Sequence, residues 1–88
     1  MSALPPPQTP LSNHPLPALE RWLVELGAQQ AGPHSCHWQL QRSGWSAVIE
    51  LEVEELSVRW SSAQGEVQRQ FPYGFSRCDV EAAILAGP

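Results

Sequence analysis

Apolar and polar residues alternate along most of the segment 45–60, but the phase of the alternation changes once. The apolar positions are odd-numbered in the first half and even-numbered in the second: Ile49, Leu51 and Val53, then Leu56, Val58 and Trp60. Successive side chains of a strand point to opposite faces, so an uninterrupted strand keeps one phase. The change at Glu54-Glu55 therefore predicts a turn between two antiparallel strands.

This predicted hairpin has a definite register. A turn at Glu54-Glu55 gives the facing apolar pairs Val53–Leu56, Leu51–Val58 and Ile49–Trp60. On the solvent face, the same register pairs Glu50 with Arg59, a carboxylate with a guanidinium. Opposite charges that face each other across a strand pair are weakly stabilising.

A second hairpin is predicted immediately before the first. Residues 37–42 alternate as a strand, and Ser43-Gly44 is a plausible two-residue turn. The register of that turn gives the facing pairs Leu40–Ala47 and Trp38–Ile49. Because both turns bring apolar residues to one common face, we expect a meander, with a fourth strand at 66–71 after a turn at 61–65.

Two helices flank the predicted sheet. The first is expected to begin at Asn13-His14 and to end at Gly27, with an apolar stripe of Leu16, Leu19, Trp22, Leu23 and Leu26. The second is expected to begin at Ser76, which can cap its first turn, and to end at Gly87-Pro88.

These elements predict a small single α+β domain over residues 13–88. Its order is a helix, a four-stranded antiparallel meander and a helix, with both helices packed on one face of the sheet. Residues 1–12 are rich in proline, and we expect them to form a disordered tail with nothing to bury.

The charge of the chain narrows the classes of partner. The net charge is −4, and the five basic residues are all arginine. Nucleic acids and anionic membranes bind clustered lysine and arginine, so we expect neither as a partner. No apolar run approaches the length of a membrane span, and the first residues do not resemble a secretory signal, so we expect a cytoplasmic location.

Glutamates are concentrated in the segment 50–55, which we call the acidic hairpin. An acidic surface of this kind can dock onto a basic surface of a protein partner or of a second copy. The expected partner-binding residues are Glu50, Glu52, Glu54, Glu55 and Arg59.

The sequence contains no recognisable catalytic machinery. No G-x-S-x-G, P-loop or G-x-G-x-x-G motif is present, so we expect neither an enzyme nor a bound cofactor. The alternative is a small regulatory domain that binds a metal or a ligand through His34, Cys36, His37 and Cys78. Zinc takes such ligands, but their spacing matches no common site, and we expect no metal.

Four blocks of the chain are similar to a known family. They are Asn-His-Pro-Leu-Pro-Ala-Leu-Glu-x-Trp-Leu at 13–23, Trp45 followed by Ala-Val-Ile-Glu-Leu at 47–51, Val-Glu-Glu-Leu-Ser-Val-Arg at 53–59, and Phe-Pro-Tyr-x-x-Ser-Arg-x-Asp-Val-Glu-Ala at 71–82. Together they resemble a small cyanobacterial family classed as a domain of unknown function, over roughly residues 10–88. The resemblance implies a cyanobacterial cytosol and supplies no catalytic residue, cofactor or partner.

Overall fold

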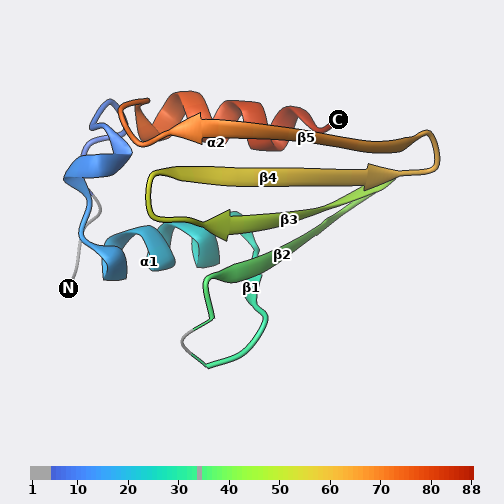
Figure 1. Cartoon of the computed structure of the whole chain (residues 1–88), viewed down its shortest axis with the longest axis horizontal. Helices are drawn as coiled ribbons and strands as arrows, with labels where there is room; N and C mark the ends of the chain where they lie inside the picture. The colour runs from blue at the N-terminus through green and yellow to red at the C-terminus, as the bar shows by residue number, and fades with distance from the viewer. Residues whose placement is uncertain (1–4, 34) are drawn as a thin grey trace.

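Five antiparallel strands in a single sheet and two α-helices form the computed structural model, which describes residues 5–33 and 35–88 (Figure 1). The strands lie in the sheet in their chain order, β1-β2-β3-β4-β5. The elements are η1 (Leu11–Asn13), α1 (Leu16–Leu26), β1 (Gln29–Gln30), β2 (His37–Arg42), β3 (Trp45–Leu51), β4 (Glu55–Ser62), β5 (Gly65–Pro72) and α2 (Arg77–Ala86). The predicted α+β class is confirmed, and no helix among the described residues is both long and apolar enough to cross a membrane.

Helix α1 ends where the sequence predicts but begins differently. Gly27 stops the helix in the left-handed region at φ 99°, a conformation that glycine adopts without steric cost. At the other end, the N-cap is Pro15 and no side chain of the described residues caps the helix, so the expected cap at Asn13-His14 is wrong. His14 is instead buried, and its Nδ1 lies 3.0 Å from the Pro10 carbonyl oxygen.

The hairpin of β2 and β3 has the predicted register. Leu40 faces Ala47, and Trp38 faces Ile49. Gly44 in the two-residue turn has a φ of 87°, which suits a tight hairpin turn. The turn and the apolar pattern therefore specify the same pairing.

The hairpin of β3 and β4 is shifted by two residues from the predicted register. The facing pairs are Leu51–Leu56, Ile49–Val58, Glu50–Ser57 and Val48–Arg59. A shift of two keeps every side chain on its expected face, but it moves Val53 out of the sheet. The apolar alternation cannot distinguish these two registers, because both keep the same residues on each face.

A fifth strand was not predicted. Gln29 and Gln30 pair with Gln39 and Trp38 at the edge of β2. Two polar residues carry no measurable periodicity, so the four-stranded prediction is corrected to five strands.

The proline-rich segment is partly packed against the domain. Leu11 is 1 % exposed and belongs to the core. The Arg77 and Cys78 amides donate to the Thr9 and Pro7 carbonyl oxygens, at 3.0 and 2.9 Å, and this satisfies two free amides of the first turn of α2. The expectation that nothing in residues 1–12 is buried is therefore wrong for Leu11, while residues 1–4 lie outside the described part of the chain.

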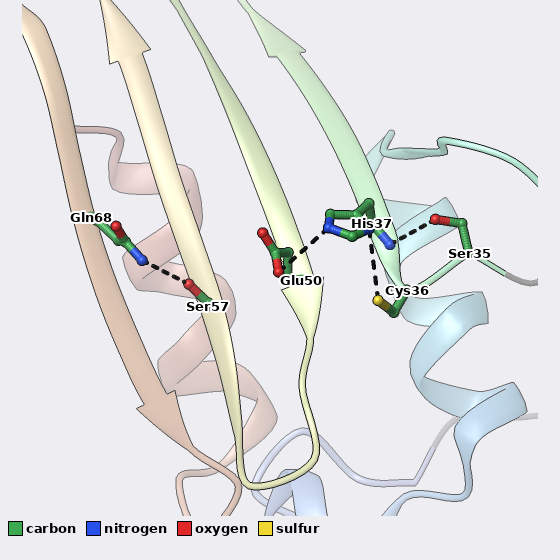
Figure 2. Close-up of polar contacts among 6 residues, drawn as sticks. All are labelled: Ser35, Cys36, His37, Glu50, Ser57 and Gln68. Atoms are coloured by element: carbon green, nitrogen blue, oxygen red, sulfur yellow. Dashed lines mark hydrogen bonds and ion pairs between the residues drawn. The ribbon is translucent and has the colours of Figure 1, made fainter.

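One face of the sheet carries the core. Its strand residues pack with the buried side chains of both helices, and the core cluster includes Trp22, Leu23, Ile49, Leu56, Val58, Trp60, Phe71, Val80 and Ile84. Figure 2 shows both helices behind the sheet, on the side away from the polar side chains drawn in front. We call these two sides the covered face and the open face.

Candidate protein-interaction surface

The turn between β3 and β4, together with the first residue of β4, forms the segment Glu52–Glu55, which we call the acidic tip. The Glu52 amide donates to the Glu55 carbonyl oxygen at 3.0 Å and closes the turn. Val53 is 96 % exposed and is flanked by Glu52 and Glu54, which are also exposed. The tip therefore presents one apolar side chain surrounded by carboxylates.

A tyrosine from another part of the fold fixes the position of the tip. The Tyr73 hydroxyl, from the connection between β5 and α2, donates to the Glu52 carbonyl oxygen. Burial raises the pKa of Tyr73, and the nearby charges of Glu52, Cys36 and Glu55 raise it further. The hydroxyl therefore stays protonated at neutral pH and remains a donor.

The carboxylates of the tip have no cationic partner within the described residues. The ion pairs found there join Arg21 to Glu25 at 3.3 Å and His37 to Glu50 at 3.5 Å. The expected pair of Glu50 with Arg59 is wrong, because Arg59 faces Val48 and Gln68. The register shift of two residues explains this difference.

The open face extends from the tip across the sheet and is mainly polar. Figure 2 shows His37 of β2 beside Glu50 of β3, and Gln68 of β5 beside Ser57 of β4. The Gln68 side chain donates to the Ser57 hydroxyl at 3.3 Å. The expected partner-binding residues thus form two groups: Glu50 and Arg59 lie on the open face, and the other three lie in the tip.

The residues of the metal hypothesis are only partly brought together. The Cys36 Sγ lies 3.7 Å from the His37 Nδ1. Cys78 instead lies on α2, where its Sγ is 3.4 Å from the Ser76 hydroxyl oxygen. Among residues 5–33 and 35–88, no three metal-ligating side chains form a cluster, and His34 lies outside the described residues.

A surface hollow of about 560 Å³ adjoins the tip and is lined by Cys36 and residues 50–55. Sequence reasoning had placed Val53 in the core and missed its exposure. It also missed the role of Tyr73, because no local pattern links a tyrosine to a turn that is distant in sequence. The glutamates that lie close together in the sequence did indicate where the acidic surface lies.

The comparisons with known proteins give a family and no function. A family model described as DUF3143, protein of unknown function, matches residues 26–87, from the end of α1 to the end of α2. No curated protein and no solved structure matches the chain. Because the match covers the whole sheet and most of the chain, this protein belongs to the DUF3143 family.

Proposed function

We propose that this protein is a non-catalytic interaction or assembly module whose acidic tip docks onto a basic surface of a protein partner. The observation that carries the proposal is the tip itself: exposed glutamates without a cation among the described residues, around a Val53 side chain that is 96 % exposed. In line with the sequence resemblance, we propose this role in a cyanobacterial cytosol.

The charges of the tip have a cost that docking would offset. Like charges on adjacent residues repel one another and slightly destabilise the fold. A basic partner would relieve that repulsion, and complementary charges also raise the rate of association. Val53 could then enter an apolar depression of the partner, since removal of an exposed side chain from water is favourable.

Charge reversal tests the proposal. Glu52→Lys combined with Glu54→Lys should leave the fold intact and abolish capture of the native partner from lysate at low salt. The matched control is Glu20→Lys with Glu25→Lys on α1, which changes the net charge equally and disturbs only the exposed ion pair of Arg21 with Glu25. Since the Debye length is about 8 Å at physiological ionic strength, wild-type capture should weaken as salt increases.

Two outcomes would overturn docking by the tip. One is that the tip variant and the control variant lose the same partners to the same extent, which would indicate an effect of net charge. The other is that both variants capture the same partners as the wild type at every salt concentration, which would make the tip a solvated surface.

A regulatory metal or ligand site remains the second candidate, favoured by the contact between Cys36 and His37. Elemental analysis of the purified protein tests it. Zinc near one equivalent that is lost in Cys36→Ser and retained in Ser57→Ala would support this candidate. Zinc content at background in the wild-type protein would remove it for zinc.

A further inference from the structure

Strand β5 forms one edge of the sheet, and its end nearest the turn to β4 extends beyond the helices. Figure 1 shows β5 at the border of the sheet and the β4–β5 turn beyond the ends of both helices. Residues 65–70 are all exposed, including Val67, which points to the covered face yet is 44 % exposed. The opposite edge is β1, which has only two residues, so β5 is the long free edge.

The hydrogen-bond pattern shows which backbone groups of β5 are free. The Glu52 amide donates to the Glu55 carbonyl oxygen, so Glu52 and Glu55 form a hydrogen-bonded pair of β3 and β4. The next pair, Leu51–Leu56, is therefore a non-hydrogen-bonded pair, and Leu56 makes no backbone bond to β3. Bonded and non-bonded pairs alternate in an antiparallel ladder, and the even-numbered residues of β4 therefore bond to β5. Their partners on β5 are odd-numbered, so Glu66, Gln68 and Gln70 direct their amides and carbonyls outward.

The charge of β5 agrees with pairing to a second copy. Pro72, which has no amide hydrogen to donate, also falls on an outward position, and it ends the run of free outward amides at Gln70. The strand contains one acid, Glu66, and one base, Arg69, so it is locally neutral in a chain of net charge −4. A second copy can therefore approach along β5 without meeting the charge of the acidic tip.

From this geometry we propose that β5 pairs with β5 of a second copy, antiparallel and about a two-fold axis at Gln68. In that register, Gln68 faces Gln68 of the second copy, and Glu66 faces Gln70, so all three outward residues exchange backbone bonds. On the covered side, Val67 faces Arg69, whose guanidinium already lies over the Phe71 ring at 5.0 Å to its centroid. A shift that brings Arg69 opposite Arg69 is disfavoured by like charge.

The two-fold arrangement also separates the acidic tips. Glu55 faces Pro72 at one end of β5, and the turn to β4 lies at the other end. An antiparallel pair therefore puts the two tips at opposite ends of a continuous sheet, where their mutual repulsion is screened. Docking by the tip and pairing through β5 use different surfaces, and either can fail without the other.

Sedimentation over protein concentrations from about 1 µM to about 1 mM tests this pairing. The wild type should form dimers in a concentration-dependent manner. Gln68→Pro removes an amide that points away from β4 and that, by the hydrogen-bond pattern of the described residues, is free; the variant should weaken dimerisation at least about tenfold. The matched control Gln68→Ala keeps the amide and should dimerise, as should Glu52→Lys with Glu54→Lys. A wild type that stays monomeric, or Gln68→Pro that dimerises normally, would overturn the proposal.

Cross-linking tests the register and does not depend on the proline variant. In a background of Cys36→Ser and Cys78→Ser, Gln68→Cys should form a disulfide-linked dimer, because facing Cα atoms lie about 5.5 Å apart. Glu66→Cys should not, since its equivalent in the second copy is displaced along the strand. Efficient cross-linking through Glu66→Cys with none through Gln68→Cys would contradict the proposed axis.

Discussion

Neighbouring residues of β3 lie on two faces of the sheet with very different surroundings. Ile49 on the covered face is 0 % exposed and packs in the core, whereas Val48 and Glu50 on the open face are only partly buried. On the covered face, a polar group such as the Trp60 indole donates to a buried carbonyl, that of Ile84 at 3.1 Å. The open face instead carries serine, glutamine and charged side chains, which apart from the buried Ser57 are exposed or partly exposed. The comparison indicates that the covered face determines stability, while the open face and the tip are free to serve binding.

The sharpest test of this division compares adjacent residues. Ile49→Asp buries an unpaired carboxylate, which costs several kcal/mol, comparable with the total stability of a small domain, and should unfold the protein. Val48→Asp should cost less than about 1 kcal/mol, because it places the carboxylate on the open face opposite Arg59. Urea denaturation of both variants measures the difference, and equal losses of stability would contradict the two-face account.

Two buried tryptophans refine the comparison within the covered face. The Trp60 Nε1 bonds to the Ile84 carbonyl oxygen, whereas the buried Trp38 Nε1 has no partner among the described residues. Trp60→Phe should therefore be more destabilising than Trp38→Phe by about 0.5–1.5 kcal/mol, since it removes a buried hydrogen bond, although the Ile84 carbonyl still accepts from the Gly87 amide at 3.2 Å. Thermal or urea denaturation of the matched pair gives the answer. A larger loss for Trp38→Phe would show that this bond does not stabilise the covered face.

Tyr73 links the tip to the rest of the fold, and its raised pKa predicts that the stability of the protein decreases at alkaline pH. Its pKa is raised from 10.0, first by burial, so the folded state retains the proton better than the unfolded state. This contribution to stability is complete below about pH 10 and is lost as the pH rises through the higher folded-state pKa. Tyr73→Phe should remove this loss of stability. The chain contains no other tyrosine and no lysine, so titration of those residue types does not obscure the effect. Urea midpoints measured across this pH range should fall for the wild type and change less for the variant.

The smallest effect is expected on the open face. The His37 and Glu50 side chains lie 3.5 Å apart but are 51 % and 29 % exposed. A double-mutant cycle with His37→Ala and Glu50→Ala should give a coupling below about 1 kcal/mol. A coupling of several kcal/mol would mean that the open face also supports the fold.

The sequence predicts the hairpin of β2 and β3 better than the hairpin of β3 and β4, for a physical reason. The apolar alternation specifies which face a residue occupies, but it does not distinguish registers that differ by two. At Ser43-Gly44, the glycine resolves this ambiguity, because it favours a tight two-residue turn. The glutamates of the acidic tip give no such signal, and Val53 therefore appeared to be a core residue.

The parts that could not be predicted depend on contacts that are distant in sequence. Leu11 lies in a proline-rich segment, and only its contact with the rest of the core shows that it is buried. The bond from Tyr73 to Glu52 likewise joins two segments that show no shared pattern. The position of the acidic residues, in contrast, was visible directly, because clustered like charges need solvent in any fold.

The most direct test of docking by the tip is a map of backbone amide shifts of the labelled protein as a purified captured partner is added. The account predicts the largest shifts in the acidic tip and in the adjoining open-face residues of β3 and β4, such as Glu50 and Ser57. These shifts should diminish as salt increases, and they should be absent for Glu52→Lys with Glu54→Lys. Shifts confined to α1, α2 or the outer edge of β5 would contradict the account.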